Sequence, residues 1–110
     1  MKYSTQQNIQ THLQNHRHFF ATQKTKDVDF RIENLRKLKS SILRFEQEIC
    51  TALWQDLHKS YEEAYLTEIS IVLGEIDFHL KNLRRWARPK RVAMPIKLFP
   101  SSGKIHYEPL

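Results

Sequence analysis

The sequence has little of what ends a helix or cross-links a small domain. It contains two glycines, one cysteine and four prolines in 110 residues, and all four prolines lie in the last quarter of the chain. Because glycine and proline most often interrupt helices, this distribution favours long helices up to about residue 88, followed by an extended segment. The lone Cys50 gives no disulfide framework and favours a reducing compartment.

Long apolar runs and leader features are also missing. No stretch approaches the ~20 apolar residues that a membrane-spanning helix needs, and residues 1–18 lack the apolar core of a secretory signal. We therefore expect a cytoplasmic protein with no membrane segment in this chain.

Motifs that carry chemistry are absent as well. We find no Gly-rich phosphate loop, no H-E-x-x-H, no C-x-x-C and no nucleophile elbow. His12, His16 and His18 cluster, but no nearby cysteine or carboxylate completes a metal site. Cys50 lies on an apolar helical stripe, which favours a buried structural thiol over a nucleophile. We therefore predict no catalytic, cofactor-binding or metal-binding residue in this chain.

The net charge of +6 comes from one segment. Residues 81–97 carry seven basic and no acidic side chains. Such a run is able to hold phosphates, but Lys and Arg near a helix C-terminus also complement the helix dipole. No nucleic-acid-binding motif accompanies the run. We predict no nucleic-acid partner and keep a basic nucleic-acid-binding module as an alternative.

Apolar periodicity predicts a mainly α chain of three to four helices with a C-terminal extended segment or hairpin. A first helix is expected over 5–22, and Asp27 or Asp29 caps the next one. Apolar residues then recur at three- and four-residue steps over 28–52, as one helix or as two joined near residues 44–48. Ser60 and Glu63 form a capping box that starts a helix reaching about residue 88.

The helix expected over 60–88 is apolar on two sides. One broad stripe consists of Leu66, Ile69, Val72, Leu73, Ile76, Leu80 and Leu83. Ala64, Ile71 and Phe78, seven residues apart, form a second stripe nearly opposite, and Gly74 lies close to it. The earlier helices can cover one side. The second side therefore calls for a partner that this chain does not supply.

The C-terminal segment carries a hairpin pattern. "PSSG" at 100–103 has turn chemistry between the apolar stretches 96–99 and 104–107. Ile105 and Tyr107 alternate with polar residues, as in a half-buried strand. Since an isolated hairpin is marginal in water, we expect the partners of this strand in further polypeptide or in a second copy of the chain.

Taken in order, these pieces resemble the N-terminus of an aldehyde dehydrogenase of the class 3, or fatty aldehyde dehydrogenase, group. The residues that carry the resemblance are "RIENLRKL" from Arg31, "ALWQDLHKS" ending at Ser60, "EA" followed by "EI", "LKNLRRW" ending at Trp86, and the closing "EPL". The resemblance covers residues from about 19 to 110 and about the first quarter of a typical member of the family.

The resemblance implies that the chain is the N-terminal part of an α/β fold. Residues 1–88 would be the helical part of the cofactor-binding domain, and 89–110 an extended linker with the start of a bridging, oligomerising strand. The parent enzyme would oxidise aldehydes to carboxylic acids with NAD or NADP. Its nucleophile, base and cofactor site would lie beyond this chain, which alone would be inactive and bind no cofactor.

The resemblance also implies two substrate-tunnel residues. Leu66 and Ser70 occupy positions where class 3 relatives often place aromatic side chains, so a substrate preference does not carry over. The alternative places Leu66 in the core and Ser70 as a solvated or packed helix residue. We further expect a homodimer or self-association, with the aldehyde as a partner only in the full-length enzyme. A self-contained helical protein–protein interaction module remains the alternative to the whole assignment.

Overall fold

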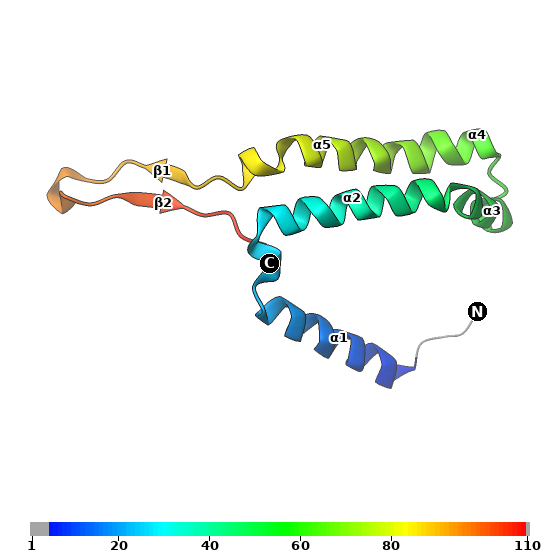
Figure 1. Ribbon diagram of the computed structural model, residues 1–110, viewed down its shortest axis with the longest axis horizontal. Coiled ribbons are helices and arrows are strands. Elements are labelled where there is room, and N and C mark those ends of the chain that lie inside the picture. The colour runs from blue at the N-terminus through cyan, green and yellow to red at the C-terminus, as the bar shows by residue number, and fades with distance from the viewer. Residues whose placement is uncertain (1–4, 110) are drawn as a thin grey trace.

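The computed structural model describes residues 5–109, in which helices are followed by a long hairpin (Figure 1). The helices are α1 (Gln6–Ala21), α2 (Val28–Arg44), α3 (Glu46–Leu57), α4 (Tyr61–Ala64) and α5 (Ser70–Trp86), and the strands are β1 (Lys90–Val92) and β2 (Gly103–Ile105). Short 3₁₀ turns cover Lys24–Lys26 and Ile96–Leu98. None of the described helices has the length and apolarity needed to cross a membrane.

The ends of the helices follow local sequence signals. The Asp27 carboxylate accepts a hydrogen bond from the Asp29 N–H at 3.0 Å, and Ser60 Oγ accepts one from the Glu63 N–H at 3.2 Å. The joint predicted near residues 44–48 is confirmed, because α2 and α3 meet at Phe45. The mainly α fold class is therefore confirmed, with a hairpin at its C-terminal end.

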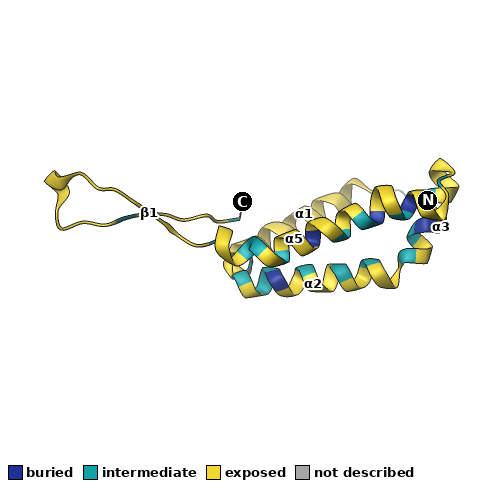
Figure 2. Ribbon diagram, turned by 90° about the horizontal axis from the view of Figure 1, so that it is seen from above, coloured by how far each residue is buried: buried dark blue, intermediate teal, exposed yellow. Residues whose placement is uncertain are grey.

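Helices α2 and α5 lie side by side and antiparallel (Figure 1). Two ion pairs join their flanks: Lys39 Nζ lies 2.6 Å from Asp77 Oδ1, and Arg84 binds the Asp29 carboxylate. Each helix also buries an isoleucine, which stabilises the pair by about 1.5–3 kcal/mol per side chain. These buried residues are Ile32 and Ile76 (Figure 2).

A second packing centre lies where α3 meets α4. Cys50, Ala64 and Ile69 are buried there together. Around them pack half-buried apolar residues: Ile42, Ile49, Leu53, Tyr65 and Leu73. The interpretation of Cys50 as a buried thiol in a helical packing position is therefore confirmed, since its exposed fraction is 4%.

A π-helical turn over Tyr65–Ile69 separates α4 from α5. In an α-helix, residues five apart point about 140° away from each other, yet Ala64 and Ile69 face the same core. The π turn inserts one residue and brings them together. The prediction that Ala64 shares a stripe with Ile71 and Phe78 is wrong for this reason. Ala64 is fully buried, whereas Ile71 and Phe78 are exposed.

The two strands pair with each other at the C-terminal end. β1 runs antiparallel to β2, with Val92 opposite Gly103. A Cβ atom at Gly103 would lie 2.7 Å from Val92 Cγ2 and 2.8 Å from Met94 Sδ, so this site accepts only glycine without a shift of its neighbours. The strand expected near the C-terminus thus finds a partner within the described chain.

The prediction that residues 96–99 form the first strand of the hairpin is wrong, because β1 at Lys90–Val92 takes that place. Residues 96–99 do not pair with β2; Ile96–Leu98 form a 3₁₀ turn in which the Leu98 N–H donates to the Pro95 carbonyl at 2.9 Å. Pro95 and Pro100 bracket this segment, and proline lacks the N–H that a ladder requires. The connection between the strands is therefore longer than "PSSG" alone indicates.

The molecule is elongated, measuring 65 × 37 × 21 Å (Figure 1). Its radius of gyration is 20.5 Å, against about 13 Å for a compact domain of this length. Its accessible surface is 9700 Å², whereas a globular chain of this mass exposes roughly 6400 Å². Ile105 and Tyr107, predicted to be half-buried, are exposed. The described residues therefore do not pack into a compact globule.

A candidate substrate-facing turn between α4 and α5

The described residues offer few groups for cofactor or metal chemistry. Within 5–109, no three histidine, cysteine or acidic side chains are placed to hold a metal ion. His12, His16 and His18 lie exposed on α1. Gly74 lies within α5 and Gly103 in β2, so neither forms a phosphate-binding turn. We therefore assign the described residues no step of cofactor chemistry.

The chain reverses sharply between α3 and α4. His58 ends α3 with φ of 53°, in the left-handed region, and its N–H donates to the Trp54 carbonyl at 2.9 Å. Ser60 already caps α4. Only Lys59 stands between these two residues, so both helix ends fix the position of its backbone.

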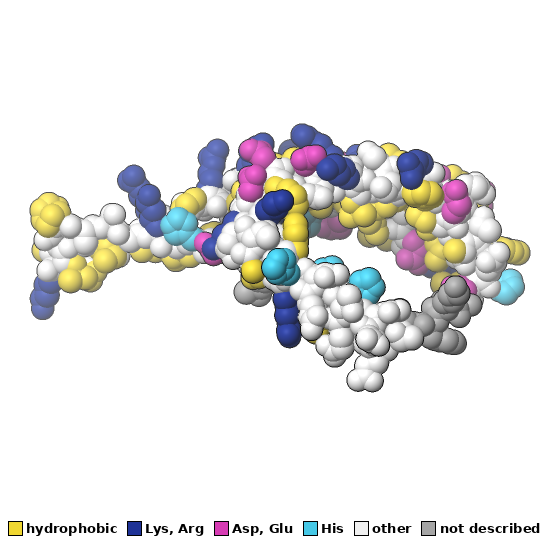
Figure 3. Space-filling view, turned by 60° about the horizontal axis from the view of Figure 1, so that its bottom comes forward, with side chains coloured by type: hydrophobic (Ala, Val, Ile, Leu, Met, Phe, Trp, Pro, Cys, Tyr) yellow, Lys and Arg dark blue, Asp and Glu magenta, His cyan; other side chains and the backbone are white. Residues whose placement is uncertain are grey.

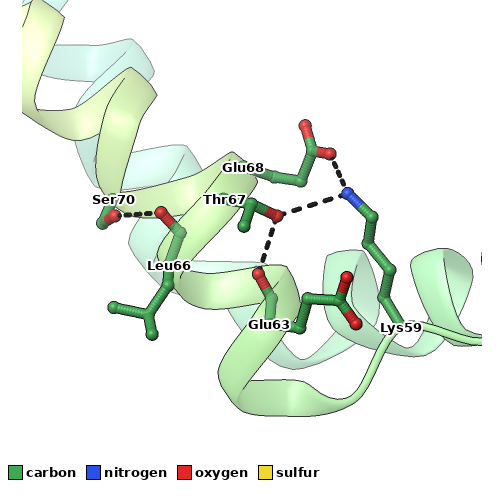
Figure 4. A network of polar contacts seen from close by, with 6 residues as sticks. All are labelled: Lys59, Glu63, Leu66, Thr67, Glu68 and Ser70. Atoms are coloured by element: carbon green, nitrogen blue, oxygen red, sulfur yellow. Dashed lines mark hydrogen bonds and ion pairs between the residues drawn. The ribbon is translucent and has the colours of Figure 1, made fainter.

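Lys59 reaches from this reversal to the π turn (Figure 4). Its ammonium donates to the Glu68 carboxylate and, at 3.2 Å, to Thr67 Oγ1. The Thr67 hydroxyl in turn donates to the Glu63 carbonyl at 2.8 Å. The Lys59 side chain is only 21% exposed, which makes its ion pair the most shielded of those among the described residues.

Ser70 closes the π turn with both of its donors. Its backbone N–H donates to the Tyr65 carbonyl, five residues back, and its hydroxyl donates to the Leu66 carbonyl at 2.9 Å. The hydroxyl thus occupies the carbonyl that the N–H would meet in an α-helix. The Leu66 side chain is 65% exposed and points away from the Lys59 ammonium (Figure 4). Leu66 is therefore not a core residue of the described chain, and Ser70 is half-buried.

A second hydrogen bond fixes the start of α4 against α3. The Tyr61 hydroxyl donates to the Glu46 carboxylate, and this hydrogen bond is the main reason that the pKa of Tyr61 rises to about 12. The Tyr61 ring also stacks on Tyr65, with ring centroids 6.4 Å apart. Tyr61, Cys50 and Lys59 line the same shallow hollow. The start of α4, which leads into the π turn, is therefore held to α3 by Tyr61 as well as by the Lys59 reversal.

The Lys59 contacts and the π turn were missed by sequence reasoning. Two signals for the turn are present in the sequence. Ala64 and Ile69 are apolar and five residues apart, and Thr67 and Ser70 carry hydroxyls that can bind carbonyls four residues back. The family resemblance implied Leu66 and Ser70, and the structure places them on one turn of helix.

Comparison with known proteins identifies relatives of this chain, although no protein-family model matches it. The chain is 46% identical over 91 residues to a 4,4'-diaponeurosporen-aldehyde dehydrogenase of Staphylococcus aureus, covering 83% of the chain and 20% of that protein. It is 36% identical over 98 residues to a dimeric NADP-preferring aldehyde dehydrogenase of Canis lupus familiaris, covering 89% and 22%. The chain is homologous to the N-terminal part of aldehyde dehydrogenases.

The fold agrees with this homology. A solved structure described as the substrate-bound state of Staphylococcus aureus AldH superposes with a TM-score of 0.84 and 40% identity, over 96% of this chain and 22% of that one. Other aldehyde dehydrogenase relatives include family 3 members. The resemblance drawn from the sequence is confirmed. The chain spans about a fifth of the length of the curated relatives it matches.

Proposed function

We propose that this chain is the N-terminal segment of a class 3-like enzyme that oxidises aldehydes to carboxylic acids with NAD or NADP. The observation that carries the proposal is the superposition on an aldehyde dehydrogenase over 96% of the chain. The nucleophile and the cofactor site are assigned to the rest of that enzyme. Cys50 is buried in a helical core, and the described residues hold no dinucleotide turn. The chain alone is inactive in this proposal.

The exposed surface supports a larger parent protein. The chain exposes about 3,300 Å² more than a compact protein of its mass. Permanent interfaces bury about 2,000–5,000 Å² summed over both partners, which is about 1,000–2,500 Å² on each. The excess on this chain alone is larger than that share. The exposed apolar residues of α5, Ile71 and Phe78, would be covered by the further polypeptide.

Leu66 and Ser70 are proposed to face the apolar part of the aldehyde. Leu66 presents an exposed aliphatic side chain, and the Ser70 hydroxyl spends its proton on the Leu66 carbonyl. The surface formed by Leu66 and Ser70 therefore offers little hydrogen bonding to a substrate. Such a surface favours aldehydes with an extended hydrocarbon chain. The Staphylococcus aureus relative is named for 4,4'-diaponeurosporen-aldehyde.

We further propose that the parent enzyme is a cytoplasmic homodimer that uses the hairpin for contact between subunits. Apolar side chains gather at the end of the hairpin farthest from the helices (Figure 3). Ile96 is 92% exposed and Phe99 is 85% exposed there, which invites burial against another surface. The relative from Canis lupus familiaris is described as dimeric. The cytoplasmic location is proposed from the lone thiol Cys50, which favours a reducing compartment.

The test replaces the matching segment of the Staphylococcus aureus enzyme with this chain. We expect the chimera to reduce NAD or NADP in the presence of an aldehyde, and the same chimera with Ala64→Asp to lose both folding and activity. A chimera that folds by circular dichroism yet oxidises no aldehyde would overturn the proposal. The 110-residue chain should show no turnover by itself; turnover abolished by Cys50→Ser would contradict the assignment of the nucleophile elsewhere.

A further inference from the structure

Lys59 is bound to the π turn by two contacts but lies away from the surface that Leu66 presents. Its ammonium binds Thr67 Oγ1 and the Glu68 carboxylate, and the Leu66 side chain extends in the opposite direction (Figure 4). A molecule resting on Leu66 therefore does not touch the Lys59 ammonium. Any influence of Lys59 on such a molecule must act through the backbone of the turn.

The conformation of this turn decides which side chains face outward. With the extra residue of the π turn, Ala64 and Ile69 both enter the core, and Leu66 remains exposed. Without it, an α-helical path starting from Ala64 would rotate every later side chain by about 100°. Ser70 and the residues that follow would then face different surroundings. A π turn is uncommon because its hydrogen-bond geometry is strained relative to the α-helix, so it needs support from outside the helix.

Lys59 provides that support from a fixed position. The left-handed His58 and the helix cap at Ser60 hold the Lys59 backbone on either side. Its side chain is shielded from solvent, which strengthens a charge-assisted contact relative to a fully exposed ion pair. The contact with Thr67 also orients the hydroxyl that donates to the Glu63 carbonyl.

We propose that Lys59 is a positioning residue for substrate selection. It clamps Thr67 and Glu68, holds the π turn, and thereby sets where Leu66 and Ser70 stand against the hydrocarbon chain of the aldehyde. This inference rests on the proposed function, because it assumes that an aldehyde passes Leu66. The reacting carbonyl group lies elsewhere, so the clamp affects the recognition of long chains more than the chemical step.

The test uses the complete enzyme with Lys59→Met, which keeps most of the length of the side chain and removes its ammonium group. The ratio of kcat/KM for dodecanal to that for propanal should fall roughly tenfold, mainly through KM for dodecanal, with propanal changed less than about twofold. Lys59→Arg keeps a donor for Thr67 and Glu68 and should restore most of the ratio. Lys39→Met, which breaks the ion pair to Asp77 between α2 and α5, is the matched control and should leave the ratio unchanged.

An unchanged ratio of kcat/KM values in a folded Lys59→Met enzyme would overturn the positioning role. This outcome includes an equal loss of kcat/KM for both aldehydes. Amide hydrogen exchange separates this outcome from failure of the proposed function. In Lys59→Met, exchange of the amides at Ile69 and Ser70 should rise at least about tenfold over that in Lys39→Met, whether or not the enzyme oxidises aldehydes. Unchanged exchange at these amides shows that Lys59 does not hold the turn.

Discussion

The hydroxyl of Ser70 donates to the carbonyl oxygen of Leu66 at 2.9 Å, while the Ser70 backbone N–H donates to the carbonyl of Tyr65. One residue thus satisfies two successive carbonyls of the π turn. A side-chain hydroxyl takes over the hydrogen bond that the wider turn removes from the backbone. The same bond leaves the Ser70 side chain with no proton to offer a neighbouring molecule.

Ser70→Ala should lower the free energy of unfolding by about 1 kcal/mol, because the Leu66 carbonyl loses its hydroxyl donor. Ser70→Thr keeps a hydroxyl at the same atom and should lose less. Urea denaturation followed by circular dichroism measures both differences. Equal stability of Ser70→Ala and the parent chain would show that water replaces the hydroxyl at no cost.

Ala64→Leu should destabilise the fold by about 1–3 kcal/mol, because the added carbons have no space beside Cys50 and Ile69. Glu62→Leu, at an exposed position of the same short helix, is the matched control and should change stability by less than about 0.5 kcal/mol. Thermal unfolding of the two variants compares them directly. Similar midpoints for both would place Ala64 outside the core.

The Tyr61–Glu46 hydrogen bond should make stability depend on pH in the alkaline range. The bond raises the pKa of Tyr61 from its ordinary value of 10.0 to about 12 in the folded chain. Because the folded-state pKa is raised, the stabilisation is complete below pH 10.0 and is lost as the pH rises towards about 12. Denaturation at a series of pH values, compared with Tyr61→Phe, measures this.

The expected signature is a stability difference between the parent chain and Tyr61→Phe that shrinks through that interval. Tyrosinate absorbance provides an independent check, since the parent chain should contain a late-titrating tyrosine that Tyr61→Phe lacks. If the tyrosine lost in Tyr61→Phe ionises near the ordinary pKa of 10.0 rather than late, Glu46 does not hold the phenol proton.

Cys50 should react slowly with thiol reagents in the folded chain, because it is buried beside Ala64 and Ile69. We expect labelling roughly a hundredfold slower than in denaturant, the factor that a local opening free energy of about 3 kcal/mol gives. A Cys50→Ser, Thr51→Cys double variant moves the thiol to an exposed neighbouring position and should react rapidly. Equal rates for the two thiols would mean that the α3–α4 packing does not persist.

Local signals in the sequence predict most of the helices. Asp27 and Ser60 were recognised because cap residues act on the backbone within three positions of themselves. The π turn is not predicted because it involves contacts outside its own helix, among them those of Lys59, and because a fixed period of 3.6 residues cannot represent an inserted residue. The error then carried over to Ala64, whose expected face was opposite to its observed one.

The hairpin is a second feature that local sequence signals predict only in part. The turn residues were recognised, but turn chemistry does not say how long the loop is. Pro95 and the 3₁₀ turn after it lengthen the connection, so that the partner of β2 is β1 rather than residues 96–99. At the candidate site, the sequence and its family resemblance predicted Leu66 and Ser70, whereas Lys59 became visible only from its contacts.

The elongated outline has a consequence for measurements of mass in solution. A radius of gyration of 20.5 Å is what a compact protein of roughly 350 residues would have. A single copy of this chain would therefore leave a sizing column in the place of a globular protein about three times its mass. An early elution volume says nothing by itself about association, and the number of chains has to come from light scattering or sedimentation equilibrium.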